Sequence, residues 1–459
     1  MQSGERETPM STNHFADSDS GTTSTGNVTV APDDDSTAPP KGRGKAVGTL
    51  AVAYSVDNTE NSLINTFFPL IRDAFGLSLG ALGILASLSR FARMIAGPAW
   101  AMAADRFGRK KVLFLVTGLW GLWTASAGLA QNFTMLLVLY GIGVLGTVAS
   151  EPIIYGLLGD LFRDEQRGRA FGTVRGVGAL IAMGLGPAIA LFANDPNGWR
   201  YGMFVMGGLS VLSGFGILAF VQEPERTTAV SDDPDVGRFR IGDAVKLFKI
   251  PTIALLAGML PLVTSLVLYT FLVTFFVDAR GWEVPSAALL FAVFSGGMAL
   301  SSIVGGFLGD WFVRCFGLKG RVMLMQLYLV AAAVASVVAL QIDWGQGLVA
   351  YVVMFLFGLV MSIGFSACVF PMVSTVAPKQ LSATAFGVLF SLIQGGLAGL
   401  MTLAMGYLGE ALGLTQVMFY FVTVPYLLNA VYWFVFYRTY PQDAAKQDER
   451  TAAIDTGTF

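Results

Sequence analysis

Hydrophobic residues in this chain are gathered into long blocks, and short polar segments separate the blocks. Each block has roughly the 20 residues that an α-helix needs to cross ~30 Å of hydrocarbon. The blocks are continuous rather than alternating, which predicts membrane-spanning helices and not the strands of a barrel. The twelve predicted spans are 47–70, 80–104, 112–130, 134–158, 170–193, 200–221, 251–277, 286–309, 322–341, 347–372, 383–408 and 415–437.

Composition and charge place these spans in a membrane and orient them. Of the 459 residues, 54% are hydrophobic and 13% are charged, which is too apolar for a soluble protein of this length. Most of the 29 Lys and Arg residues lie on one side of the predicted membrane, together with both ends of the chain. Because positive loops stay in the cytoplasm, both termini are expected to be cytoplasmic. The sequence therefore predicts an all-α, multi-pass protein of the cell (inner or plasma) membrane.

Polar segments divide the chain into parts. Residues 1–45 are rich in Ser, Thr, Asp, Gly and Pro and contain no apolar segment, so disorder is expected there. A second polar segment lies between the sixth and seventh spans. The expected parts are a disordered cytoplasmic tail (1–45), an N-terminal six-helix bundle (46–221), a cytoplasmic linker (222–250), a C-terminal six-helix bundle (251–437) and a cytoplasmic tail (438–459).

Several kinds of chemistry have no support in the sequence. The one histidine, His14, lies in the N-terminal tail, and the two cysteines lie far apart, so neither a metal site nor a disulfide framework is expected. The chain has no phosphate-binding GxxxxGK[ST] motif, and its net charge of −2 does not favour nucleic acid. We find no catalytic constellation, and expect neither an enzyme nor a cofactor.

The two sets of six spans are related by an internal repeat. Residues 170–174 read AFGTV and residues 385–389 read AFGVL, an offset of 215. A second similarity between the two halves places Asp105, near the end of the second span, opposite Asp310, near the end of the eighth. Repeats of this kind build many secondary transporters.

The segment ADRFGRKKV, at 104–112, resembles the cytoplasmic loop motif of the major facilitator superfamily. Ala101 replaces the first glycine of that motif. The resemblance extends over roughly 47–437 and implies the family's fold, two pseudo-symmetric six-helix bundles. It also implies a gating role for this loop, with Asp160 as an acidic partner and a more degraded second copy at Asp310. The alternative is that the basic cluster serves topology alone. The motif residues are Asp105, Arg106, Gly108, Arg109 and Lys110.

Six charged residues lie well inside the predicted spans, where each costs a lone helix roughly 2.5 kcal/mol or more. They are three acids and three bases in the first, second, fourth and fifth spans, which line or border the central cavity in the resembled fold. Depth suggests that Asp57 or Glu60 pairs with Arg90 or Arg93, and Glu151 with Arg175. Static helix-tying salt bridges are the alternative to a role in proton coupling or substrate binding. The six are Asp57, Glu60, Arg90, Arg93, Glu151 and Arg175.

The second half carries no charge at the corresponding places. At the 215-residue offset, Glu151 corresponds to Ser366 and Arg175 to Phe390. One bundle is thus expected to hold the ionic chemistry while the other offers aromatic and weakly polar groups. The candidate polar groups of that cavity wall are Tyr269, Ser295, Ser366 and Gln394.

The sequence predicts a secondary active transporter that moves a small organic solute by alternating access. Coupling to protons through Asp57 or Glu60 is expected, since two carboxylates three residues apart on a helix raise each other's pKa. An organic anion is the preferred solute, because Arg90 and Arg93 share a helix face. The alternatives are an exporter of amphipathic, lipid-like or drug-like compounds and, more distantly, a non-transporting membrane sensor. The expected partners are the solute, protons and the lipid bilayer, with the protein working as a monomer.

Overall fold

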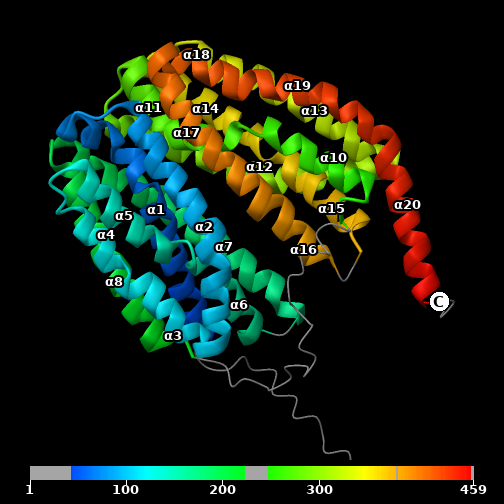
Figure 1. The fold of residues 1–459 in the computed structure, drawn as a ribbon, viewed down its shortest axis with the longest axis horizontal. Coiled ribbons are helices and arrows are strands. Elements are labelled where there is room, and N and C mark those ends of the chain that lie inside the picture. The colour runs from blue at the N-terminus through cyan, green and yellow to red at the C-terminus, as the bar shows by residue number, and fades with distance from the viewer. Residues whose placement is uncertain (1–42, 163, 223–246, 379–380, 456–459) are drawn as a thin grey trace, which may run out of the picture. The chain divides into compact units, whose positions relative to one another are not determined.

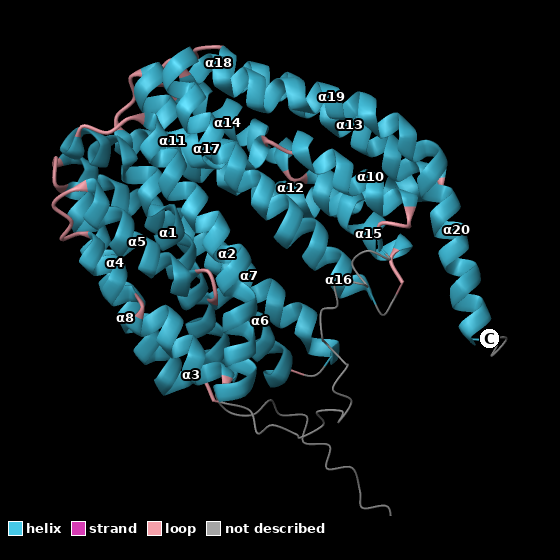
Figure 2. Cartoon of the chain, in the orientation of Figure 1, coloured by secondary structure: helices cyan, strands magenta, loops and turns pink. Residues whose placement is uncertain are grey.

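The computed structural model describes residues 43–162, 164–222, 247–378 and 381–455, and those residues form helices joined by short loops, without strands (Figure 2). Each of the twelve predicted spans is mostly helical, with short breaks in several of them. Residues 1–42 and 223–246, which include most of the predicted tail and linker, lie outside the described residues. The all-α fold expected from the hydrophobic blocks is therefore confirmed.

Six spans form the first bundle, and several of them consist of more than one helical piece (Figure 1). Its elements are α1 (Arg43–Phe75), α2 (Leu79–Phe107), α3 (Arg109–Leu113), η1 (Phe114–Leu119), α4 (Gly121–Ala127), α5 (Phe133–Thr147), α6 (Ser150–Leu161), α7 (Asp164–Ala190), η2 (Leu191–Asn194) and α8 (Gly198–Phe220).

The second bundle is more often interrupted, and four of its spans contain a π-helical turn. Its elements are α10 (Pro251–Met259), η3 (Leu260–Leu262), α11 (Ser265–Arg280), α12 (Val284–Phe316), α13 (Lys319–Ser336), η4 (Val337–Gln341), α14 (Leu348–Met361), η5 (Phe365–Val369), α15 (Phe370–Val376), α16 (Ser382–Phe386), η7 (Gly387–Gln394), α17 (Gly395–Leu412), α18 (Leu414–Met418), η8 (Phe419–Thr423), α19 (Val424–Tyr432), η9 (Trp433–Val435) and α20 (Phe436–Asp455).

Ten of the described helical segments are long and apolar enough to cross a membrane. The first and third predicted spans are not among the ten. α1 carries polar residues along much of its length, and the third span is divided into α3, η1 and α4 with a turn at Trp120. Both segments are nevertheless helical at the predicted positions, so the prediction of twelve helical spans holds for the described chain.

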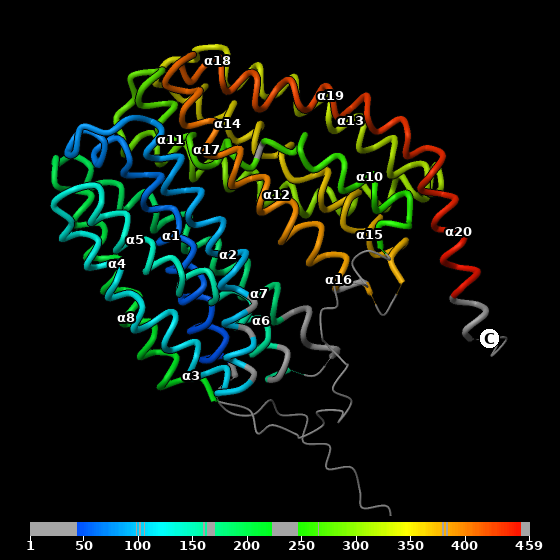
Figure 3. The backbone as a smooth tube through the Cα atoms, in the orientation of Figure 1, coloured from blue at the N-terminus to red at the C-terminus, as the bar shows by residue number. Residues whose placement is uncertain are grey.

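The most extensive contacts between the two bundles join α2 with α17, α7 with α12 and α1 with α11 (Figures 1 and 3). Small residues allow the closest of these approaches, since Gly83 lies against the backbone of Thr402 and Leu403, and Gly406 against Leu79. Close backbone approach through glycine is a general device of helix packing in membranes. The start of α2 and the end of α17 are thus tightly joined.

An ion pair between the bundles lies where α1 and α11 end. The guanidinium group of Arg72 donates two hydrogen bonds to the carboxylate of Asp278, one of them at 2.8 Å from Nη2 to Oδ1. Both side chains are about one fifth to one quarter exposed. We call this contact the external ion pair, because the orientation expected from the sequence places it on the external side.

The last helix, α20, packs back onto the second bundle. Phe436, Tyr440 and Ala444 recur about one turn apart and are fully buried. Asp443, on the same face, accepts hydrogen bonds from the backbone N–H and from Oγ1 of Thr252, both at 2.8 Å. Those first N–H groups of α10 have no partner within their own helix, so Asp443 supplies the cap from a distant segment.

Candidate functional site

Helix α1 presents two different polar faces. Tyr54, Asn58 and Asn61 follow one another at intervals of about one turn, and all three are partly or fully exposed. Asp57 and Glu60, only three residues apart, are 2% and 5% exposed. Because each helical residue turns by ~100°, the acids lie on another side of the helix from the asparagines. This geometry separates the buried acids from the accessible polar groups.

The buried acids are held by hydroxyl groups of the third and sixth spans. Thr117 Oγ1 donates to Asp57 Oδ2 at 3.1 Å, and Ser210 Oγ donates to Glu60 Oε2 at 2.5 Å. Thr124 donates to the other oxygen of Glu60. The predicted pairing of Asp57 or Glu60 with Arg90 or Arg93 is therefore wrong, because the acids face η1, α4, α6 and α8 rather than the arginines of α2.

A small cavity lies beside Glu60 within the first bundle. It measures about 20 Å³, counted as the space open to the centre of a water molecule. Oxygen atoms come to its wall from α1, α4 and α5, through the side chains of Glu60, Asn61, Thr124, Tyr140 and Thr147. The remaining wall is apolar. Ordered water in proteins is found in cavities that offer several polar partners, as this one does.

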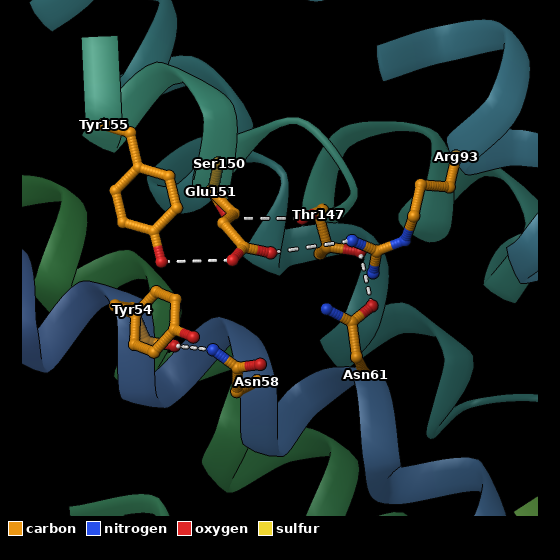
Figure 4. Close-up of polar contacts among 8 residues, drawn as sticks. All are labelled: Tyr54, Asn58, Asn61, Arg93, Thr147, Ser150, Glu151 and Tyr155. Carbon is orange, nitrogen blue, oxygen red and sulfur yellow. Dashed lines mark hydrogen bonds and ion pairs between the residues drawn. The ribbon is translucent and has the colours of Figure 1, made fainter. Parts of the chain in front are cut away.

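A second polar group, which we call the arginine cluster, is shown in part in Figure 4 and consists of Tyr54, Asn58, Arg93, Glu151, Tyr155 and Arg175. Arg93 Nη1 lies 3.9 Å from Glu151 Oε2, and the two side chains are 50% and 37% exposed. Tyr155 donates a hydrogen bond to Glu151 Oε1 at 3.1 Å. An ion pair this long and this exposed adds little stability, so a competing anion can displace it.

The ion pair described for Glu151 differs from the predicted one. Its partner is Arg93 of α2 and not Arg175 of α7. Arg175 is exposed and lies within electrostatic range of Glu151, Tyr54 and Tyr155. Depth along the spans assigned Arg93 to Asp57 or Glu60 and Arg175 to Glu151, and the assignment of Arg93 is wrong, because helix rotation also decides which side chain meets the carboxylate.

Arg90 reaches from the first bundle to the second. Its Nη2 donates to the carbonyl oxygen of Leu266 at 2.9 Å and to Thr270 Oγ1 at 3.2 Å, both on α11. Tyr269, on the same helix, lies within electrostatic range of Arg90. None of these partners carries a negative charge. With the acids of α1 facing elsewhere, the arginines between the described bundles outnumber the nearby carboxylate, so the local charge is positive.

The candidate polar residues of the second bundle are mostly engaged within their own helices. Ser295 donates to the Phe291 carbonyl at 2.8 Å, and Ser366 to the Ser362 carbonyl at 3.0 Å. Gln394 is partly exposed at the end of η7. The hydrogen bonds described for these residues do not reach the arginine cluster.

Aromatic side chains occupy the corresponding region of the second bundle. Phe370 and Phe390 meet edge to face with ring centroids 5.1 Å apart, and Phe386 and Phe365 lie 5.6 and 6.2 Å from Phe390. Phe390 is the repeat counterpart of Arg175, and Phe365 precedes the counterpart of Glu151. The sequence indicated an apolar second half but not this cluster, because its members come from η5, α15, α16 and η7.

The loop motif packs against the fourth span. The guanidinium group of Arg109 lies so close to Gly156 of α6 that a methyl group there would sit 2.8 Å from Nη1. Gly108 has φ of 105°, which permits the sharp step from α2 to α3, and Arg106 lies 5.4 Å from the ring of Phe107. Lys110 is partly exposed. The side chains of Asp105 and Asp160 lie outside what the structure describes, so their gating roles stay predictions.

The second copy of the loop motif, at Asp310, also has an arginine that packs against a neighbouring span, and this arginine is Arg321. Arg321 Nη2 lies 3.9 Å from Asp310 Oδ1, and Arg321 Nη1 donates to the Ala367 carbonyl at 2.6 Å. Arg321 thus joins the eighth, ninth and tenth spans, as Arg109 joins the third and fourth. Sequence spacing did not show this pair, because the arginine follows Asp310 after a longer loop.

Two helical bundles with charged side chains between them are the architecture of a secondary transporter. The particular family is identified by a family model that matches most of the chain. The model of the Major Facilitator Superfamily matches residues 50–400, and the protein belongs to that family, as the loop motif suggested.

Relatives and solved structures agree with this assignment. A probable sulfoacetate transporter of Cupriavidus necator is 26% identical over 59% of this chain, and the match covers 65% of that protein. A probable galactarate/D-glucarate transporter of Escherichia coli is 22% identical over 72% of this chain and 79% of its own length. A bacterial homologue of the human lysosomal transporter Spinster, in an inward-facing and occupied conformation, superimposes with a TM-score of 0.72 at 20% identity, covering 88% of this chain and 98% of that one.

Proposed function

We propose that this protein is a proton-coupled secondary transporter that carries a small organic anion across the cell membrane by alternating access, as a monomer. The observation that supports an anionic solute is the arginine cluster together with its neighbour Arg90. Arg93 holds Glu151 by a long, half-exposed contact, and Arg90 and Arg175 lie near it. A bound carboxylate or sulfonate would complete the charge balance and could engage a guanidinium group through two hydrogen bonds.

The named relatives support the same class of solute. Sulfoacetate, galactarate and glucarate, which appear in the names of the two transporters above, are small organic anions. Similarity to these transporters does not by itself identify the substrate of this protein. Together with the positive charge between the bundles, it favours small acids over neutral sugars.

Proton coupling is assigned to the buried acids of α1. Asp57 and Glu60 face hydroxyl groups and each other, and the structure describes no arginine or lysine in contact with them. Binding a proton removes one of two neighbouring negative charges from a buried position within the membrane, which is favourable. Release of that proton on the other side would link the solute to the membrane gradient.

The experiment uses purified protein in proteoliposomes and follows counterflow of labelled sulfoacetate and glucarate. Arg93→Ala should raise the KM about tenfold or more, equivalent to ~1.4 kcal/mol, because a charged hydrogen-bonding partner is lost. The KM should rise less in Arg93→Lys than in Arg93→Ala, because lysine keeps the positive charge but lacks the planar guanidinium group.

Arg450→Ala is the matched control, since Arg450 is exposed on α20, far along the chain from the cluster. It should leave the KM unchanged. If neutral analogues compete as well as the acids do, or if Arg93→Ala binds the acids as tightly as the wild type, the anion proposal is contradicted.

The aromatic cluster of η5, α15, α16 and η7 favours a second candidate, an exporter of amphipathic compounds. Its phenylalanines would receive an apolar tail while the arginine cluster receives an acidic head. Competition by long-chain acids that grows with chain length in the counterflow assay would support this candidate, and equal potency of short and long acids would exclude it.

A further inference from the structure

We propose that the cavity beside Glu60 is a water site of a proton relay that connects the space around the arginine cluster with the buried acids of α1. The inference rests on the proposed function, since it supplies the route for the coupled proton. Its new residues are Thr147 and Asn61, with Tyr140 on the cavity wall.

The size and lining of the cavity fit one water molecule. A water needs about 10–15 Å³ of such space and two to four polar partners, and the cavity offers about 20 Å³. Five oxygen-bearing side chains line it, of which Glu60 is a carboxylate and Asn61 an amide. Thr124, Tyr140 and Thr147 contribute hydroxyl groups. The water would therefore contact Glu60 directly while being held by groups of three helices.

Asn61 and Thr147 form the boundary between this cavity and the arginine cluster. Thr147 Oγ1 donates to Asn61 Oδ1 at 3.4 Å, and both residues line the cavity. Figure 4 shows this pair directly beside the contact of Arg93 with Glu151. Thr147 is 4% exposed, whereas Asn61 is partly exposed on the accessible face of α1. A single layer of side chains thus separates Glu60 from the cluster.

The chemistry of these groups suits proton transfer. A hydroxyl group and a water molecule each donate and accept hydrogen bonds. At rest the Thr147 hydroxyl donates to Asn61 Oδ1 or to the Val144 carbonyl oxygen. When the hydroxyl turns to the relay water, the Thr147 oxygen takes up a proton from solvent on the cluster side and passes its own proton to the water, and the water passes one of its protons to the Glu60 carboxylate. Thr147 and the water are then restored, and Asn61 holds the resting hydroxyl without carrying the proton. The titratable groups near Glu60 in the described chain are Asp57 on α1 and Tyr140 on α5.

Two variants interrupt the relay in different ways. Thr147→Val removes the hydroxyl and keeps the shape of the side chain. Gly143→Ala adds a methyl group to the cavity wall, where its nearest neighbour, Thr124 Oγ1, would be at an ordinary contact distance of 3.7 Å, so the helices need not move. Thr147→Ser is the matched control because it restores the hydroxyl.

Each variant is measured in two assays in proteoliposomes. Anion counterflow at equal pH on both sides needs no net proton movement, whereas uptake driven by a pH gradient does. Thr147→Val and Gly143→Ala should keep counterflow within twofold of the wild type and lose at least fivefold of gradient-driven uptake. Thr147→Ser should keep both. Melting curves in detergent identify any variant that fails to fold.

The relay is overturned if the wild type responds to a pH gradient and both variants take up the anion under that gradient as fast as the wild type does. Failure of the proposed function looks different, because it shows in the wild type itself. The wild type would then exchange no anion in counterflow, or its uptake would follow a sodium gradient and ignore a pH gradient.

Discussion

At the scale of single residues, the six membrane charges separate into two environments. Asp57 and Glu60 are buried among hydroxyl groups, while Glu151 and the three arginines are partly or fully exposed. The sequence identified all six, because charges inside apolar blocks are conspicuous. It did not identify the partners of the acids, because serine and threonine are frequent in the spans and only helix rotation selects Thr117, Thr124 and Ser210.

The hydroxyl group of Ser210 should contribute more to stability than the hydroxyl group of Ser213 on the same helix. Ser210→Ala leaves one oxygen of a buried carboxylate without its donor, which costs ~1–3 kcal/mol, and the melting temperature in detergent should fall by several degrees. Ser213→Ala is the matched control, because Ser213 donates only to a carbonyl of its own helix.

Neutralising Glu60 should reduce the destabilisation caused by Ser210→Ala. In a Glu60→Gln background, Ser210→Ala should cost clearly less than in the wild type, since no charge is left unpaired. Equal melting temperatures for Ser210→Ala and Ser213→Ala would show that Glu60 does not depend on this contact.

At the scale of elements, α20 is the helix that the sequence described least well. The polar composition of 438–459 indicates a tail, whereas the structure shows a helix that continues to Asp455. The signal that was overlooked is the spacing of Phe436, Tyr440 and Ala444, which places three residues on one face. The cap supplied by Asp443 could not be predicted, because Thr252 lies 191 residues away in the chain.

Loss of this cap should weaken the second bundle. Asp443→Ala removes both hydrogen bonds to Thr252, and the cost of a lost helix cap is about 1 kcal/mol. The melting temperature should fall, and hydrogen exchange at the start of α10 should become faster. Asp448→Ala, an exposed change on the same helix, should alter neither. Unchanged exchange in α10 after Asp443→Ala would exclude a capping role.

At the scale of the whole molecule, twelve spans, the repeat and the family could all be predicted, because membrane helices are defined by long apolar blocks that local sequence displays directly. The contacts between the two bundles could not be predicted from the sequence. The external ion pair joins residues 206 positions apart, and the approach of Gly83 to Thr402 depends on how two helices cross. Alternating access requires such contacts to break, so they set the balance between conformations.

The external ion pair should hold the bundles together at that end. In a Cys315→Ser background, a cysteine at the buried position Thr402 reports separation through its rate of labelling by a maleimide that cannot cross the membrane. Asp278→Arg should raise this rate several-fold by repulsion, and Arg72→Asp combined with Asp278→Arg should restore it.

Asp343→Arg is the control for this measurement. Asp343 pairs with Arg280 at 3.6 Å inside the second bundle, so its reversal should leave labelling at Thr402 unchanged. A double variant that labels as fast as Asp278→Arg would show that the charges at this end do not hold the bundles.

The docking of α20 also bears on how this protein can be handled. An affinity tag or fluorescent fusion partner joined before Lys446 would replace or crowd the segment that covers α10, and poor yields should follow. The same fusion placed after Asp455 would leave that packing intact, so the two designs should differ in expression and in their elution profile on size exclusion.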